Sequence, residues 1–342
     1  MAKYNFAEGF GFRAKGHIVY SDNTAGGEGL HPQPDIKAAT ATMIVATLVA
    51  SFAIAASPPP GFSSCADQRV YSPGRRINAC TALLKRPGLS SVDRALIYYS
   101  RGTALCEKGD LNRAFDDLTR ALELAPELEV AYVSRGIVRR DLGQDLLAIR
   151  DYDIALSLQP KDARAFSNRA AAEFDLGALD RSLADYTRSI ELLPKNARAY
   201  RNRAIVHDAM GELEQAKSDY SVAISLKPTD WSAFDGRCYV LLELGHPKAA
   251  LVDCIIATRH TPRSAAAWDS KGLVLLRLGR GKAAIRAFNR ALHLSPGLAT
   301  SLYGRGIAKN RLRRPDGAAD IERARREDPK ISSKMARLGI SE

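Results

Sequence analysis

Residues 129–162 read EVAYVSRGIVRRDLGQDLLAIRDYDIALSLQPKD, and this stretch decides the fold because its pattern returns at a fixed interval along the chain. It holds two apolar-periodic segments of about three to four turns each, separated by Gly143 and closed by Pro160. The glycine can adopt the left-handed conformation that ends a helix, whereas the proline cannot continue a helix interior. We therefore predict two helices joined by a short turn in every repeat.

The period of about 34 residues is marked by proline, by glycine and by small residues on both segments. The prolines are Pro126, Pro160, Pro194, Pro228, Pro262 and Pro296. The turn glycines are Gly109, Gly143, Gly177, Gly211, Gly245 and Gly279. The small residues of the first segment are Gly102, Gly136, Ala170, Ala204, Cys238, Gly272 and Gly306. Small residues at these places would let the paired helices approach closely.

These marks resemble the tetratricopeptide repeat (TPR) family, whose repeat is a helix-turn-helix of this length. Gly136, Ala148, Tyr152, Ala155 and Pro160 stand at the family's small, alanine, aromatic, alanine and proline places. The resemblance runs from about residue 95 to residue 329 and is carried by six repeats in phase. It implies an all-α fold, a right-handed α-α superhelix of about seven repeats over residues 95–330. Residues 331–342 would add a C-terminal capping helix.

The N-terminal region divides into two segments of different composition. Residues 1–37 are Gly-rich and polar without a sustained period, which predicts a disordered extension. Residues 38–56 are uncharged and mostly apolar, which is typical of a signal peptide or a membrane anchor. The sequence Ala53-Ile54-Ala55 favours cleavage and a periplasmic or secreted protein. An inner-membrane anchor and a cytoplasmic chain are the alternatives.

Residues 57–94 are expected to form an N-terminal cap. Ser72 and Pro73 are helix-start signals, and an apolar stripe follows them. The segment also resembles the start of exported bacterial TPR proteins, in which a cysteine precedes a helix that begins like Ile77-Asn78-Ala79-Cys80-Thr81. This resemblance implies a disulfide between Cys65 and Cys80 in an oxidising compartment. Two thiols in a reducing cytosol are the alternative.

Two further cysteines, Cys238 and Cys254, are expected to be buried on the paired helices of one repeat, where a second bond is a further alternative.

Charges follow the same period. A basic residue directly precedes the small residue of each first segment. In five repeats an aspartate lies sixteen residues after this basic residue. We predict that the pairs join first and second helices, within a repeat or across to the next, as structural ion pairs. The pairs are Arg101 with Asp117, Arg135 with Asp151, Arg169 with Asp185, Arg203 with Asp219 and Arg237 with Asp253. A basic stripe that binds a polyanion is the alternative, which the repeated acids disfavour.

A second set of polar residues is expected to contact a partner, because first helices line the concave peptide-binding surface of the TPR family. Asparagine can hold an extended peptide backbone, and arginine can form a fork onto a carboxylate. The predicted partner-binding residues are Arg139, Arg140, Arg164, Asn168, Arg198, Arg201 and Asn202. A solvated helix face is the alternative. The family's carboxylate-clamp pattern does not carry over, because Tyr99 and Thr103 stand at the matching places.

The sequence holds no catalytic or metal-binding motif, so we predict neither an enzyme nor a cofactor. The predicted function is a noncatalytic scaffold that binds a peptide or protein segment in its concave groove. The net charge of +12 lies mostly after residue 270. This asymmetry gives the alternative function, a membrane-anchored envelope assembly factor whose basic C-terminal end contacts an anionic surface or polymer. Nucleic acid is disfavoured, because no aromatic residues interleave with the basic region.

Overall fold

The computed structural model describes residues 59–342. The predicted extension, the predicted signal peptide or anchor and the first two residues of the predicted cap lie outside this range. All regular elements between residues 59 and 342 are helices, and this range contains no strand, which confirms the predicted all-α class. No helix in it is long and apolar enough to span a membrane. The described chain divides into an N-terminal part, residues 59–126, and a C-terminal part, residues 127–342.

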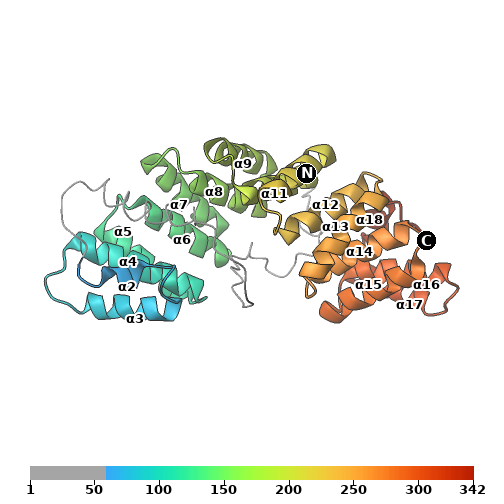
Figure 1. Cartoon of the computed structure of the whole chain (residues 1–342), viewed down its shortest axis with the longest axis horizontal. Helices are drawn as coiled ribbons and strands as arrows, with labels where there is room; N and C mark the ends of the chain where they lie inside the picture. Colours follow the sequence, from blue (N-terminus) through green and yellow to red (C-terminus); the bar gives the residue numbers. More distant parts are fainter. Residues whose placement is uncertain (1–58) are drawn as a thin grey trace, which may run out of the picture. The chain divides into compact units, whose positions relative to one another are not determined.

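The N-terminal part contains four helices (Figure 1). They are α2 (Phe62–Ala66), α3 (Pro73–Leu84), α4 (Ser91–Glu107) and α5 (Leu111–Leu124). Helix α3 begins at the predicted start signal, with Ser72 at its N-cap and Pro73 in its first turn. A disulfide joins Cys65 to Cys80 and ties α2 to α3.

A fully buried arginine, which the sequence analysis did not single out, holds α3 against α4. Arg76 is 0% exposed, and its Nη1 lies 2.8 and 2.9 Å from the two carboxylate oxygens of Glu107. Its Nη2 donates to Thr103 Oγ1 at 3.2 Å, and its Nε donates to the carbonyl of Cys65 at 3.4 Å. The buried charge is therefore paired, as burial of a guanidinium requires.

The C-terminal part is a series of helix pairs followed by one short helix (Figure 1). The first helices of the pairs are α6 (Glu129–Asp141), α8 (Ala163–Asp175), α10 (Ala197–Ala209), α12 (Trp231–Glu243), α14 (Ala265–Arg277) and α16 (Ala299–Arg311). The second helices are α7 (Asp145–Leu158), α9 (Leu179–Leu192), α11 (Leu213–Leu226), α13 (Pro247–His260), α15 (Gly281–Leu294) and α17 (Gly317–Glu327). The last helix is α18 (Ile331–Arg337). Each first helix packs most extensively on the second helix of its own pair.

The turn and the close approach of each pair follow from the repeated glycines. Gly143, after α6, has φ +74°, a backbone conformation that residues with a Cβ rarely adopt. Gly136 on α6 meets the ring of Tyr152 on α7 so closely that an added Cβ would lie 2.5 Å from Tyr152 Cε1. In the last repeat, which is one residue short, the residue with positive φ is Arg313 (φ +54°). A second disulfide joins Cys238 to Cys254 across α12 and α13.

Candidate binding surface on the first helices

The predicted Arg–Asp pairs lie within single repeats. In each of the five pairs an arginine nitrogen lies 2.6–2.7 Å from the aspartate carboxylate. The second nitrogen–oxygen distance in each pair is 2.8–3.0 Å, so every contact is a two-pronged fork from first helix to second helix. Each guanidinium also lies 5.5–5.8 Å from the centre of an aromatic ring three residues earlier. The structural role of the pairs stays a prediction.

In the last two repeats the basic residue before the small residue is Lys271 and Arg305, and these two residues differ in their partners. Arg305 forms the fork with Asp320, at 2.6 and 2.7 Å. Lys271 has Ala287 opposite it instead of an aspartate, and its Nζ donates to Thr258 Oγ1 at 3.2 Å and lies 4.9 Å from the ring centre of Trp268. Lys271 thus keeps the aromatic contact found in the other repeats but has no carboxylate opposite it.

Two of the predicted partner-binding arginines are bound to carboxylates of the chain itself. Arg139 Nη1 lies 2.9 Å from Asp151 Oδ2, and it shares this carboxylate with Arg135. Arg201 Nη1 lies 2.8 and 2.9 Å from the two oxygens of Asp230 at the start of α12. Both guanidiniums are less than a fifth exposed.

The three other predicted arginines are more accessible. Arg164 and Arg198, which stand one repeat apart on α8 and α10, are exposed. Arg164 Nε lies 3.5 Å from Asp162 Oδ1. Arg140, at the end of α6, is half-buried. Burial raises the pKa of Asp175 to about 6, and the Arg140 charge opposes part of that rise.

The two predicted asparagines stand at the same place on neighbouring first helices. Asn168 on α8 is half-buried, and Asn202 on α10 is 5% exposed. The Asn202 side chain hydrogen-bonds to the hydroxyl of Tyr186 on α9, but its Oδ1 has no hydrogen-bond partner among residues 59–342. A buried amide oxygen without a partner is rare in folded proteins and costs free energy. A hydrogen bond from water or from a bound molecule would satisfy the Asn202 Oδ1.

Several carboxyl groups on the first helices α10, α12 and α14 were not predicted from the sequence as a group. Asp208 on α10 shares a hydrogen bond with Glu243 on α12, which also accepts one from Tyr239. Asp235 on α12 hydrogen-bonds to Ser270. Asp235 and Asp269 stand one repeat period apart, so these two carboxyl groups could have been predicted from the repeat pattern.

Burial changes the ionisation of these carboxyl groups. It raises the pKa of Asp208 to about 7, and the neighbouring Glu243 carboxyl adds to the rise. It also raises the pKa of Asp235 and of Asp269 to about 6. The folded chain thus holds protons that the unfolded chain releases near pH 4, so the free energy of unfolding falls as pH rises from about 4 to about 7.

We expect the chain to melt about 4 °C higher at pH 5.5 than at pH 8, as followed by circular dichroism. Asp208→Asn removes one raised carboxyl, so it is expected to raise the melting temperature at pH 8 and to shrink the difference between the two pH values. Asp180→Asn, at an exposed position of α9, is the control and leaves the difference unchanged. Burial alone would raise the pKa of Asp320, but the hydrogen bonds and charges of Arg305 and Lys309 together lower it, so this group stays ionised at both pH values. Equal differences in the wild type and Asp208→Asn would contradict the assignment.

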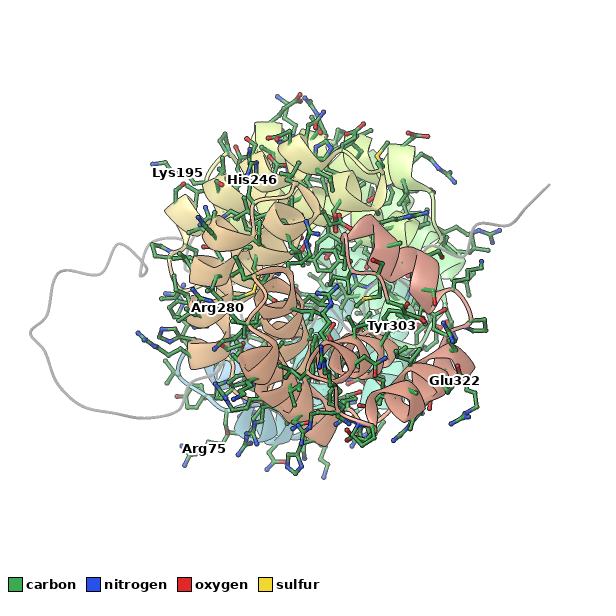
Figure 2. All side chains as sticks on the ribbon, turned by 90° about the vertical axis from the view of Figure 1, so that its right-hand side faces the viewer. Arg75, Lys195, His246, Arg280, Tyr303 and Glu322 are labelled. Atoms are coloured by element: carbon green, nitrogen blue, oxygen red, sulfur yellow. A yellow bond between two sulfur atoms is a disulfide. The ribbon has the colours of Figure 1, made fainter. Side chains whose placement is uncertain are left out.

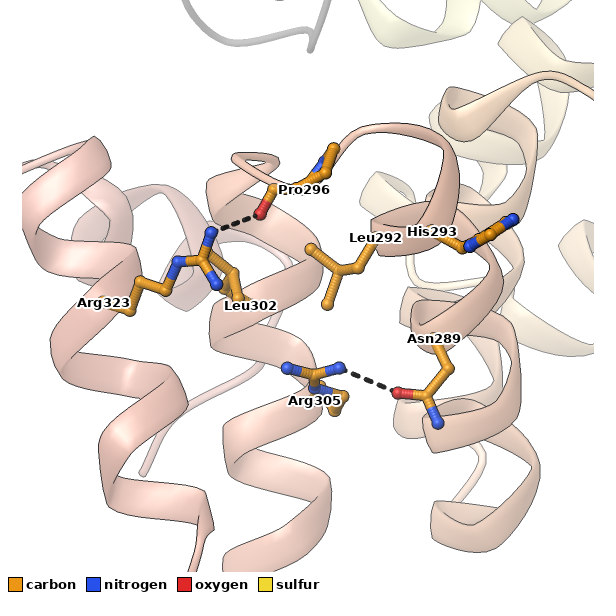
Figure 3. A pocket seen from close by; sticks show the side chains of 7 residues that line it. All are labelled: Asn289, Leu292, His293, Pro296, Leu302, Arg305 and Arg323. Carbon is orange, nitrogen blue, oxygen red and sulfur yellow. Dashed lines mark hydrogen bonds between the residues drawn. The ribbon is translucent and has the colours of Figure 1, made fainter.

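A shallow recess of about 310 Å³ lies between α15, α16 and α17 (Figure 3). Its two arginines are bound within the chain. Arg305 Nη1 donates to Asn289 Oδ1 at 2.8 Å, and Arg323 Nη2 donates to the carbonyl of Pro296 at 3.0 Å. The recess therefore offers few polar groups to a ligand. Residues 59–342 also contain no cluster of three or more potential metal ligands.

Two family models, both of the tetratricopeptide repeat, match the chain. One matches residues 134–197, 239–299 and 271–330, and the other matches residues 95–128 and 197–230. Together they cover more than half of the sequence, and the chain belongs to the tetratricopeptide repeat family. Proteins of this family are generally noncatalytic scaffolds, and the repeats make this chain a protein-interaction scaffold.

Several solved structures share the fold. One is a chain of the APC/C hetero-tetramer Cut9–Hcn1, with 18% identity and a TM-score of 0.62 over 78% of this chain and 52% of that chain. A TPR protein from Parabacteroides merdae has 20% identity and a TM-score of 0.54 over 70% of this chain and 93% of that chain. PilF of Pseudomonas aeruginosa has 17% identity and a TM-score of 0.56 over 62% of this chain and 96% of that chain.

These similarities confirm the predicted TPR solenoid class and concern the fold alone. The chain spans about half the length of the Cut9–Hcn1 chain that it matches. Among curated protein sequences, none matches this chain.

Proposed function

We propose that this TPR scaffold binds an extended protein segment along the first helices α8, α10 and α12. The observation that carries the proposal is Asn202, whose buried side-chain oxygen has no hydrogen-bond partner among residues 59–342. Asn168 stands one repeat earlier at the same place. An amide side chain both donates and accepts, as does each peptide group of an extended chain, so two asparagines in register can hold a backbone of any sequence.

The charged residues around the asparagines would set specificity. Arg164 and Arg198 lie one turn before Asn168 and Asn202, at positions where an arginine can form a fork onto a carboxylate of the segment. Asp208 and Asp235 each have one buried oxygen without a hydrogen-bond partner among residues 59–342. A donor from the bound segment, such as a backbone N–H or a basic side chain, would satisfy them. The proposed segment is therefore polar and carries charges of both signs.

The compartment is part of the proposal. The bonds Cys65–Cys80 and Cys238–Cys254 favour an oxidising environment, such as a periplasm or the outside of a cell. The predicted signal peptide or anchor at residues 38–56 lies outside the described residues. The alternative function, an anchored assembly factor with a basic end on an anionic surface, stays a prediction.

Peptide-display selection against the whole chain, followed by fluorescence anisotropy with the selected peptides, tests the proposed groove. The double variant Asn168→Ala with Asn202→Ala removes two to three hydrogen bonds to the bound backbone at about 1 kcal/mol each, so the affinity should fall roughly 30-fold or more. Asn112→Ala, at an exposed position of the second helix α5, is the matched control and should bind as the wild type does. An undiminished affinity in the double variant, with helix content intact, removes the proposal.

A further inference from the structure

The final residues of the sequence lie against the first helices of the last repeats. Leu338 and Ile340, which follow α18, are 3% and 0% exposed. They belong to one apolar cluster with residues of three first helices, among them Leu242 of α12, Leu273 of α14 and Ile307 of α16. We call residues 338–342 the tail segment.

Polar side chains of α14, α16 and α17 bind the tail segment. Arg277, the last residue of α14, donates from Nη1 to the carbonyl of Gly339 at 2.7 Å. Arg311, the last residue of α16, donates from Nη2 to the carbonyl of Ser341 at 3.2 Å. Tyr303 of α16, labelled in Figure 2, donates from its hydroxyl to Glu342 Oε1 at 3.1 Å. Arg325 of α17 forms an ion pair with the same carboxylate.

The repeat spacing gives this arrangement the form of a peptide-binding site. Arg277 and Arg311 stand one repeat period apart, so they occupy the same place in successive repeats, and they bind alternate carbonyls of the tail segment. Between and beside those carbonyls, the aliphatic side chains of Leu338 and Ile340 are buried, while Gly339 and Ser341 are exposed. The tail segment is a turn and not an extended strand, because Gly339 has φ +64° and the Ile340 N–H donates to the carbonyl of Met335 at 3.0 Å. Carbonyls that accept from side chains of the surface, together with side chains held in apolar sites, are features by which a protein surface binds a peptide.

We propose that the first-helix surface of α14 and α16 is a second protein-binding site, which the tail segment occupies within its own chain. The partner is a protein segment with two aliphatic residues at alternate positions followed by a carboxylate, the pattern of Leu338, Ile340 and Glu342. Arg277 and Arg311 would bind its backbone carbonyls, and Tyr303 with Arg325 would bind its carboxylate. This inference concerns other helices than the groove proposed on α8, α10 and α12 and does not depend on it.

The tail segment acts in this proposal as a competing ligand. A short covalent connection gives an attached segment an effective concentration in the millimolar range. A partner must displace the tail segment before it binds. The apparent affinity of the partner is therefore its affinity for the open site multiplied by the fraction of chains in which the site is open. Removing the tail segment should therefore strengthen binding of a free peptide of the same sequence.

The test compares the full chain with a chain that ends at Arg337, using a fluorescein-labelled peptide with the sequence of residues 333–342, SKMARLGISE. We expect the shortened chain to bind this peptide at least tenfold more tightly than the full chain in an anisotropy titration. Arg277→Ala in the shortened chain, or aspartate in place of the isoleucine in the peptide, should abolish most of the gain. Asn202→Ala in the shortened chain should leave the affinity unchanged, which separates this site from the groove on α8, α10 and α12.

A second variant keeps the tail segment and loosens it. Gly339 has φ +64°, and an added Cβ would lie 2.0 Å from Arg277 Nη1, so Gly339→Ala displaces the guanidinium that binds this residue. We expect full-length Gly339→Ala to bind the peptide with an affinity between those of the full and shortened chains. If both variants melt at lower temperature but bind the peptide no better than the wild type, the tail segment is a structural cap only, and the proposal is wrong.

Discussion

An Asp151→Ala chain is expected to lose about 3–5 kcal/mol of stability, because one buried carboxylate balances two arginines. Asp151 is 1% exposed and lies 2.7 Å from Arg135 Nη2 and 2.9 Å from Arg139 Nη1. Truncation leaves both guanidiniums, which are 14% and 16% exposed, without their counterion. A melting curve followed by circular dichroism should shift down by about 10 °C for the transition of the C-terminal part.

Asp153→Ala is the matched control for this prediction. Asp153 is two residues further along α7 and lies 2.6 Å from Arg169 Nη1, but its side chain is 53% exposed. Arg169 also keeps its fork with Asp185. An exposed pair contributes about 0–1 kcal/mol, so the melting temperature should move by no more than about 3 °C. Similar losses in the two variants would show that the buried pairs do not stabilise the repeats as we infer.

A Gly272→Ala chain is the second variant with a large expected effect, at about 2–3 kcal/mol of destabilisation. The ring of Phe288 on α15 is 0% exposed and lies between Gly272 on α14 and Gly304 on α16. A Cβ on Gly272 would come within 2.5 Å of Phe288 Cε1, and one on Gly304 within 2.4 Å of Phe288 Cζ. The ring cannot move away from one glycine without approaching the other, so the helices must separate. Denaturant unfolding measures the loss.

Two further variants separate crowding from other effects of the added methyl group. Gly281→Ala, at the start of α15, places its Cβ at an ordinary 3.4 Å from Leu312 Cδ1 and should be neutral or slightly stabilising. Phe288→Leu in the Gly272→Ala background makes room and should recover part of the lost stability, although Phe288→Leu alone destabilises. Additive losses in the double variant would exclude crowding as the cause.

Features that repeat in register could be predicted from the sequence. The turn glycine, the small residues and the sixteen-residue spacing from arginine to aspartate each appear in several repeats, so chance agreement was small. The sequence left open whether an arginine pairs within its repeat or with the next one. Helix geometry decides this, because both members of each pair lie on the contact face of one helix pair.

Interactions whose sequence separation does not recur from repeat to repeat could not be predicted. Arg201 binds Asp230, and Asp208 meets Glu243, at sequence separations that match neither the repeat period nor the spacing of the Arg–Asp pairs. Arg201 therefore appeared available to a partner when in the fold it is already paired. The sequence predicts that the tail segment belongs to a capping helix. Its bonds to Arg277 and Arg311 depend on a chain reversal at Gly339, and this reversal could not be predicted because Gly339 lies outside the repeat pattern.

We propose above that the first helices α8, α10 and α12 hold a bound protein segment. Photo-cross-linking measures this most directly, with a selected peptide that carries a photoreactive residue at its centre and mass spectrometry of the cross-linked chain. We expect cross-links on α8, α10 and α12, in the neighbourhood of Asn168 and Asn202. Cross-links confined to the second helices α9, α11 and α13 would contradict it.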